Sequence, residues 1–217
     1  LSLARQGFER AARMDSLQPT YQLALGLLHE RQQQYRRARA AYLQALRLDS
    51  TFIKACSQLH NLYLHSLGRE DSAMYFNRLL LRQQPTHPLG WKNEGDYLLR
   101  KALSIRQQTQ QALLNETLQK AIEAYSAALL ADTGYVQARY NRGYCYFLTD
   151  QHQQAMEDFE RLLRRDSLHA QAHFMLGSIY EFYADTEKAR FHYTQVLKAQ
   201  PAHADARQAL KELATKP

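Results

Sequence analysis

Histidines are the residues that could most readily form a metal site, and this chain of 217 residues has nine of them. His169 and His173 stand four residues apart, a spacing that places two side chains on one face of a helix. A metal site needs further ligands, and no Cys, Asp or Glu completes a set at a recognised spacing. His169 also recurs 34 residues later as His203, which indicates a structural role. We therefore predict no metal site and no cofactor.

Cys56 and Cys145 are the candidate nucleophiles. His60 follows Cys56 by four residues, so a thiol and an imidazole could meet across one helical turn, but no third group is evident to orient the histidine as a base. A complete helical pair separates the two cysteines, which places them too far apart for a disulfide. The sequence also lacks a Gly-rich phosphate loop, a nucleophile elbow and a recognisable carboxylate pair. We predict that the chain is not an enzyme.

Composition favours long helices and no membrane span. Glycine and proline number only eight and five, and no run of 18 or more apolar residues is present. The formal charge of +7 is compatible with an acidic partner, although arginines and lysines also solvate the outer faces of helices. The densest basic segment holds Arg36, Arg37 and Arg39, which is too short for a nucleic-acid tail. We predict a protein or peptide partner, acidic in character, and no nucleic acid.

A fixed period of 34 residues organises the second half of the chain. Four pairs of residues recur at this spacing: Gly143 and Gly177, Tyr146 and Tyr180, Ala155 and Ala189, and Phe159 and Tyr193. A period of this size predicts supersecondary units that stack on their neighbours and share one continuous core.

The pattern resembles the tetratricopeptide repeat family. In that family the first helix of a repeat (helix A) has Leu-Gly at positions 7 and 8, and the second (helix B) has Ala at 20, an aromatic residue at 24 and Ala at 27. The unit from Pro19 meets this pattern with Leu25 and Gly26, then with Ala38, Tyr42 and Ala45. The resemblance implies an all-α fold, a right-handed α-solenoid of stacked antiparallel helix pairs that acts as a protein-interaction scaffold. Repeats rich in Gln, Arg and Leu are typical of its bacterial members.

We predict a single repeat array over residues 1–217. Its parts in chain order are a lone helix B (1–18), repeats at 19–52 and 53–86, an extended repeat at 88–135, repeats at 136–169 and 170–203, and a capping helix (204–217). The extension adds 14 residues, roughly Ala102 to Asn115, with apolar residues at helical spacing. We expect two lengthened helices that project about 10 Å, with the turn near Gln107 to Gln111.

The repeat at 53–86 departs from the family pattern. His60 occupies position 8, where the family has a small residue, so we expect slightly looser helix packing there. Helix B of this unit is expected to place Ser72, Phe76 and Leu79 at positions 20, 24 and 27.

The resemblance also implies a concave groove lined by residues at positions 2, 5, 6, 9, 12 and 13 of each helix A. We interpret the aromatic members as anchors for a peptide or partner helix, because exposed aromatic clusters mark interaction sites. Adjacent helices could instead cover some of them, and that alternative stays open. The predicted partner-binding residues are Asn61, Lys92, Asp96, Tyr140, Asn141, Tyr144, Phe147, Phe174, Ser178 and Phe182.

One family subgroup grips a C-terminal carboxylate with lysine and asparagine at fixed groove positions. Lys92 and Asn141 match that set, but Asp96 beside them would repel a carboxylate, so we do not predict this clamp. Two alternatives to a groove-binding scaffold or assembly factor remain: a regulatory or targeting domain of a larger enzyme, and a homo-oligomerising module such as a homodimer. Because the chain begins with Leu1, we expect an upstream segment that makes the protein periplasmic or membrane-anchored, for example as a lipoprotein, with the cytoplasm as the alternative.

Overall fold

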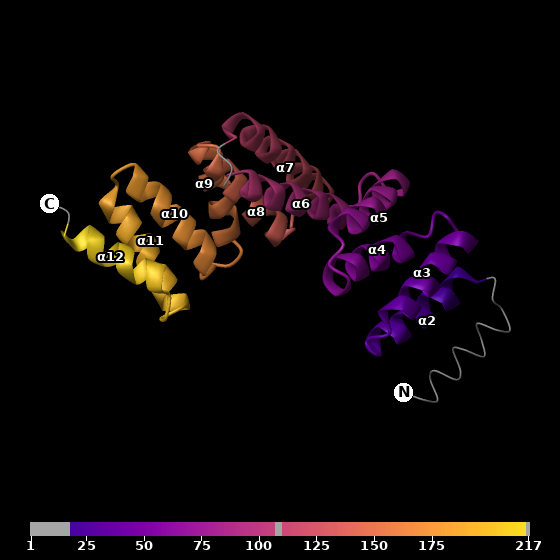
Figure 1. Cartoon of the computed structure of the whole chain (residues 1–217). Coiled ribbons are helices and arrows are strands. Elements are labelled where there is room, and N and C mark those ends of the chain that lie inside the picture. Colours follow the sequence, from indigo (N-terminus) through magenta and orange to yellow (C-terminus); the bar gives the residue numbers. More distant parts are fainter. Residues whose placement is uncertain (1–17, 107–109, 216–217) are drawn as a thin grey trace. The chain divides into compact units, whose positions relative to one another are not determined.

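The structure is a computed structural model that describes residues 18–106 and 110–215. These residues form eleven α-helices and one π-helical turn, and they contain no strand (Figure 1). The chain divides into two compact units, Leu1–Glu94 and Gly95–Pro217. The predicted lone helix at 1–18 lies outside the described residues, apart from its last residue.

The first unit is made of two helix pairs and the beginning of a long helix. Helix α2 (Pro19–Arg31) packs on α3 (Tyr35–Leu48). Helix α4 (Ile53–Asn61) continues into the π-helical turn η1 (Leu62–Ser66), and both pack on α5 (Glu70–Gln83). Helix α6 (Pro88–Arg106) begins in this unit and ends in the next.

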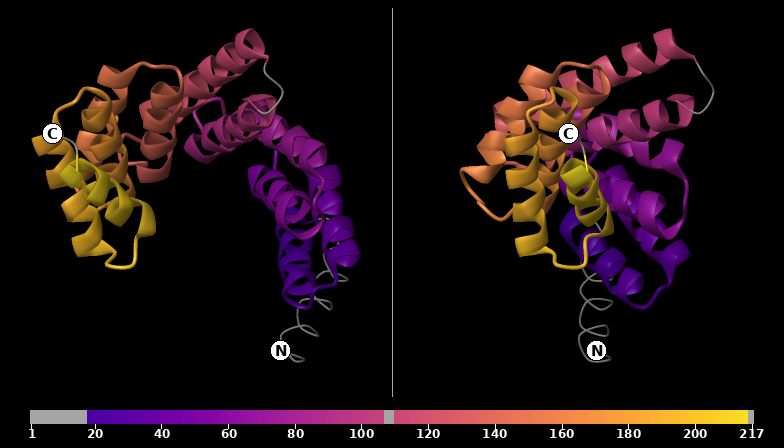
Figure 2. Two further views of the ribbon diagram at one scale, coloured as in Figure 1. Left: turned by 60° about the vertical axis from the view of Figure 1, so that its left-hand side comes forward. Right: turned by 90° about the vertical axis from the view of Figure 1, so that its left-hand side faces the viewer.

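The second unit continues the same alternation. It contains α7 (Gln111–Ala131), α8 (Val136–Leu148), α9 (His152–Leu163), α10 (Ala170–Phe182), α11 (Thr186–Ala199) and α12 (Ala204–Thr215). Helix α8 pairs with α9, and α10 pairs with α11; α12 then packs on α11, and Figure 2 shows the last three helices side by side. No helix among the described residues is long and apolar enough to cross a membrane.

Helices α6 and α7 carry the extra residues of the extended repeat. They have 19 and 21 residues, whereas α8 to α11 have 12 to 14. Ala102, Ile105 and Leu114 in the added turns are buried, so these turns belong to the packed part of the second unit. Residues 107–109, within the predicted turn, lie outside the described part of the chain.

A glycine of helix A faces an aromatic ring of helix B in four repeats. The pairs are Gly26 and Tyr42, Gly95 and Tyr125, Gly143 and Phe159, and Gly177 and Tyr193. A Cβ atom added at Gly177 would lie 2.7 Å from the ring of Tyr193, and one at Gly143 would lie 2.9 Å from the ring of Phe159. Both distances are shorter than real contacts allow, so the absence of a side chain is what lets the paired helices approach across the ring.

In the repeat that begins at Ile53, the larger side chain lies on helix A and the smaller one on helix B. His60 takes the glycine position and is only 3% exposed, with its Nδ1 3.0 Å from the carbonyl oxygen of Ala73. Asn77, which is 1% exposed, takes the position of the ring. The larger side chain is therefore on helix A instead of helix B. Both positions are filled by buried side chains, and the looser helix packing that we expected is not evident.

Helix B of this repeat is shifted by one residue from the predicted register. The π-helical turn η1 places one extra residue before α5. As a result, the residues that fill the equivalent buried positions are Ala73, Asn77 and Leu80, whereas Ser72 and Leu79 are only half-buried. Phe76 remains in the core through its stacking on Tyr63.

The turn between the two helices of a repeat contains a residue with positive φ. These residues are Gln33 (57°), Gly68 (62°), Asp150 (58°) and Ala184 (57°). A side chain in the left-handed region costs about 1–2 kcal/mol, so three of the four turns carry a strain that glycine would relieve.

We predict that Gln33→Gly raises the free energy of unfolding by about 1 kcal/mol, because it removes the left-handed strain at that turn. The matched control is Ala40→Gly on the exposed face of α3, which should lower that free energy by about 1 kcal/mol. Urea denaturation followed by circular dichroism compares the two variants. A loss of stability in both would contradict the prediction.

Candidate partner-binding surface

The five aromatic residues of the predicted groove lie on α8 and α10. Tyr140, Tyr144, Phe147 and Phe174 are half-buried against a core formed by residues of α9 and α10. Phe182, the last residue of α10, is 69% exposed. Neighbouring helices therefore cover part of four of these rings, and each of the four retains some exposed surface.

Tyr140 and Phe174 stand one repeat apart and are held in the same way. Tyr140 stacks on His169 with ring centroids 6.0 Å apart and contacts Phe159. Phe174 stacks on His203 at 5.1 Å and contacts Tyr193. The two histidine rings therefore support the aromatic ring at the same position of both repeats.

His169 and His203 also cap the helices that follow them, and His87 does the same for α6. Nδ1 of His169 accepts a hydrogen bond from the Ala172 amide at 3.2 Å, and the equivalent bonds join His203 to Ala206 (3.3 Å) and His87 to Gly90 (3.1 Å). Each bond satisfies a first-turn amide that has no partner within the helix. Among the described residues, no three His, Cys, Asp or Glu side chains form a group that could hold a metal ion.

Asp96 and Asn141, both predicted for the groove, lie together in a polar network of the second unit. The Asp96 carboxylate accepts hydrogen bonds from the Tyr125 hydroxyl (2.8 Å) and the Asn141 amide (3.0 Å), and that amide is also 3.2 Å from the Tyr125 oxygen. Burial, together with the charge of Asp96, raises the pKa of Tyr125. The Asn141 amide is therefore engaged by an aspartate and is not available to grip a carboxylate.

A carboxylate accompanies the buried tyrosine of other repeats as well. The hydroxyl of Tyr42 donates to Glu30 at 2.7 Å, and that of Tyr193 donates to Glu181 at 3.0 Å. The Tyr193 oxygen also lies 3.3 Å from the hydroxyl of Ser178, another predicted groove residue. Burial raises the pKa of Tyr193 to about 12, so it remains a hydrogen-bond donor. Where the ring is Phe159, the residue that corresponds to Glu181 is Phe147. At this position of the first helix, the two repeats that have glutamate bury a tyrosine, and the repeat that has Phe147 buries a phenylalanine.

The other two predicted residues, Asn61 and Lys92, belong to the first unit and are half-buried there. Asn61 is the last residue of α4, and Lys92 lies in the first turns of α6 beside Asn93, whose amide donates to Asn77 at 3.3 Å. Their role in partner binding stays a prediction.

An aromatic cluster at the ends of α8 and α10 includes two residues that sequence reasoning missed. His152 lies among Phe147, Phe182 and Tyr183, with ring centroids at 5.8, 4.7 and 5.6 Å. Nδ1 of His152 is 3.2 Å from the Tyr183 hydroxyl. Tyr183 is 58% exposed, so it enlarges the exposed aromatic surface that Phe182 provides. Tyr183 directly follows Phe182 in the sequence, and this adjacency could have revealed it.

The two thiols are buried and protonated. Burial raises the pKa of Cys56 to about 11 and that of Cys145 to about 12. Nδ1 of His60 lies 3.0 Å from the carbonyl oxygen of Ala73, so this nitrogen donates a proton and cannot act as a base. The arrangement is that of packing residues.

Sequence models of the tetratricopeptide repeat match residues 19–52, 114–166, 150–181 and 170–203, which together make up more than half of the chain. The chain belongs to the tetratricopeptide repeat family. It is an all-α tetratricopeptide solenoid with the protein-interaction or scaffold role of that family, whose fold is generally non-catalytic. No curated protein matches the sequence.

Solved structures of tetratricopeptide proteins share the fold. YrrB, described as a TPR protein with an unusual peptide-binding site, is 22% identical, with a TM-score of 0.75 over 94% of this chain and 97% of that chain. PilW, a type IV pilus biogenesis factor, is 20% identical with a TM-score of 0.63 over 90% of both chains. PilF of Pseudomonas aeruginosa is 18% identical with a TM-score of 0.69 over 92% of this chain and 84% of that chain.

The tetratricopeptide pattern is broken at Arg142, which stands where the family has leucine, and the structure pairs it with a buried acid. Asp158, 2% exposed, accepts from Nε and Nη2 of Arg142 at 2.7 Å each and from Arg139 at 3.3 Å. Burial opposes the charge of Arg142, but its bonds to Asp158 outweigh this and raise the pKa of the guanidinium. Arginine at a leucine position was the signal that could have revealed this pair.

We predict that Asp158→Ala lowers the free energy of unfolding by about 3 kcal/mol, because it leaves the half-buried guanidinium of Arg142 without its carboxylate partner. The double variant Arg142→Leu with Asp158→Ala should recover most of that loss, since it restores the family residue and removes the charge of Arg142, while Arg139 keeps its bond to the carbonyl oxygen of Thr133. Urea denaturation of both variants gives the comparison. An equal loss in the single and double variants would contradict this account.

A pair of histidines fixes α11 to α10. Nε2 of His173 donates to the carbonyl oxygen of Ser167 at 3.0 Å, so its Nδ1 accepts from Nδ1 of His192 at 2.9 Å. The His192 ring also stacks on Tyr180, with centroids 5.4 Å apart. Burial, with a contribution from His173, lowers the pKa of His192 to about 4.

We predict that the second unit loses stability as the pH falls from about 6.5 towards 4. The lowered pKa means that the folded state favours neutral His192, so its contribution is complete above the unfolded pKa and is lost as the pH falls through this window. His192→Asn keeps a donor for His173 and should reduce the pH dependence. His65→Asn, at an exposed histidine, should leave it unchanged in thermal unfolding measured from pH 8 to 4.

Proposed function

We propose that the chain is a scaffold or assembly factor whose second unit binds an apolar peptide or helix of a partner protein along α8 and α10. The aromatic groove of this proposal consists of Tyr140, Tyr144, Phe147, Phe174 and Phe182. The observation that carries it is the row of partly covered rings, each of which keeps exposed surface. Tyrosine is enriched among the few residues that supply most of the binding energy in protein interfaces, and phenylalanine is enriched in such interfaces.

Prior ordering of the rings supports the proposal. Tyr140 and Phe174 are held by His169 and His203, so binding would immobilise few additional side chains. Less conformational entropy is then lost when a partner docks.

The comparisons are compatible with this role. YrrB is described as having an unusual peptide-binding site, and PilW is described as a biogenesis factor of the type IV pilus. We propose by analogy that this chain also recognises a peptide segment in the course of an assembly process.

We predict that Tyr144→Ala combined with Phe174→Ala weakens partner binding at least tenfold, because both variants remove exposed ring surface from the groove. The measurement is quantitative affinity capture from the source organism with the intact chain, followed by titration of the captured partner. The matched control combines Tyr75→Ala with Phe191→Ala, which removes two exposed rings from α5 and α11. Unchanged partner capture by the groove variant, with an unchanged helical circular dichroism spectrum, would contradict the proposal.

A further inference from the structure

The positive charge of the chain is concentrated in the first unit. Residues 18–94 contain ten Lys and Arg against five Asp and Glu, a net charge of +5. Residues 95–215 contain fourteen of each, a net charge of zero. An acidic partner would therefore be attracted to the first unit, whereas the aromatic groove lies in the neutral second unit.

Helix α3 carries most of this charge. It contains four arginines and no acidic residue. Arg36, Arg39 and Arg47 are exposed, and we name them the arginine face. They lie opposite the buried side of the helix, which is formed by Ala38, Ala41, Tyr42 and Ala45.

The arginine face has no carboxylate partner within the described part of the chain. Glu30, the nearest acid before the helix, accepts from Tyr42, and Asp49, directly after it, accepts from Thr51. Arg37, beside the arginine face, donates to Gln34. Arg36 and Arg39 are three residues apart on one helix and repel each other, so their unpaired arrangement is a cost that an anionic ligand would remove.

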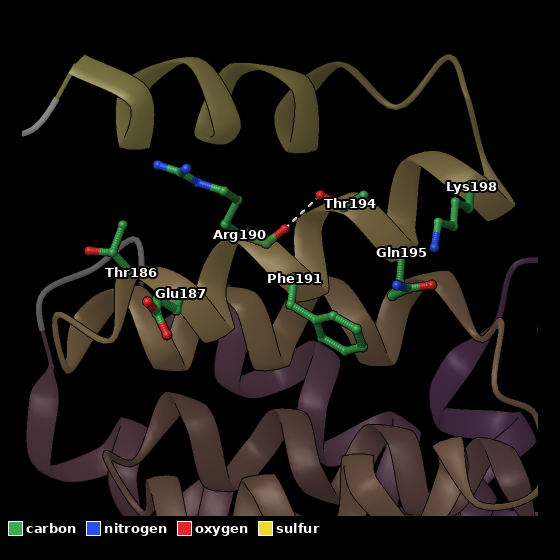
Figure 3. A pocket seen from close by; sticks show the side chains of 7 residues that line it. All are labelled: Thr186, Glu187, Arg190, Phe191, Thr194, Gln195 and Lys198. Atoms are coloured by element: carbon green, nitrogen blue, oxygen red, sulfur yellow. Dashed lines mark hydrogen bonds between the residues drawn. The ribbon is translucent and has the colours of Figure 1, made fainter.

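Other second helices mix the two signs on their exposed surfaces. Lys120 pairs with Glu116 on α7, and α5 exposes Asp71 beside Arg78 and Arg82. Figure 3 shows the same mixture on α11, where Glu187, Arg190 and Lys198 line one open hollow of about 700 Å³. The single sign of α3 is therefore not a general property of the outer helices.

We propose that the arginine face binds an acidic segment of a partner protein, at a site separate from the aromatic groove. Arg36 and Arg47 are about three helical turns apart, so the charges form a strip roughly 16 Å long and one helix wide. Such a strip fits a linear chain better than a planar membrane. Guanidinium groups also bind carboxylates through two parallel hydrogen bonds, a geometry that lysine cannot offer.

A hollow at the beginning of α3 adds an apolar contact to the strip. It has a volume of about 580 Å³ and is lined by Tyr35 and Leu67 together with Gln33, Gln34, Arg36 and Arg37. The acidic segment can therefore be held in one direction if an apolar residue at its end enters this hollow. The ligand class is an acidic peptide with one terminal apolar side chain.

The test is a fluorescence anisotropy titration of the intact chain with a labelled twelve-residue peptide that has glutamate at every second position and leucine at one end. We expect Arg36→Gln, Arg39→Gln and Arg47→Gln together to weaken binding at least tenfold. The matched control replaces Arg82, Arg161 and Arg164 with glutamine, which removes the same charge from exposed sites on α5 and at the end of α9, and should change binding less than twofold. Circular dichroism confirms that each variant is folded.

The outcomes separate this proposal from the one on the aromatic groove. The variant with Tyr144→Ala and Phe174→Ala should bind the acidic peptide as the unchanged protein does. An equal loss in the arginine variant and its control, or tighter binding to a single-stranded RNA or to phosphatidylglycerol vesicles than to the peptide, overturns the arginine face as a peptide site. A peptide that does not bind at 50 mM salt also overturns it.

Discussion

The close approach of glycine to an aromatic ring is the contact on which each repeat depends. Where Gly177 meets Tyr193, the ring fills the space that a side chain would otherwise occupy, and the two helices of the repeat can pack across it. Because this contact recurs in four repeats, the distance between paired helices is set by the same pair of positions along most of the described chain. In the repeat at Ile53, the glycine position holds the larger His60 and the ring position holds the smaller Asn77, and both side chains are buried.

The choice of ring at this contact also decides whether the first helix has to supply a hydrogen-bond acceptor. A tyrosine brings a hydroxyl into the interior, and a buried hydroxyl needs a hydrogen-bond partner. Glu30, Asp96 and Glu181 supply that partner from the first helices. Phe159 makes no such demand, and Phe147 is apolar at the corresponding place. Packing and surface chemistry are therefore linked within each repeat.

Local patterns allowed the fold and part of the candidate site to be predicted. Glycine, alanine and aromatic residues at a 34-residue period report the helix pairs because one repeat contains both sides of each contact. The pair of Arg142 with Asp158 was missed, since it depends on two residues that break the pattern together. His169 was recognised as structural from its recurrence, but its role as both cap and ring support needs coordinates. The aromatic groove and the arginine face stay predictions until a partner is measured.

The π-helical turn lies in the interval between the two parts of the chain that family models match. Family models match residues 19–52 and 114–203, and residues 53–113 lie between those ranges. The interval holds the turn at Leu62–Ser66, which adds a residue within a helix, and the lengthened pair of α6 and α7. Because the extra residue is accommodated as a wider helical turn, α4 and η1 still pack on α5. The residues of α5 are nevertheless shifted by one relative to the repeat positions. An array of this kind can therefore accept an inserted residue and still fold, because the helices keep their packing although the residues after the insertion no longer follow the 34-residue spacing.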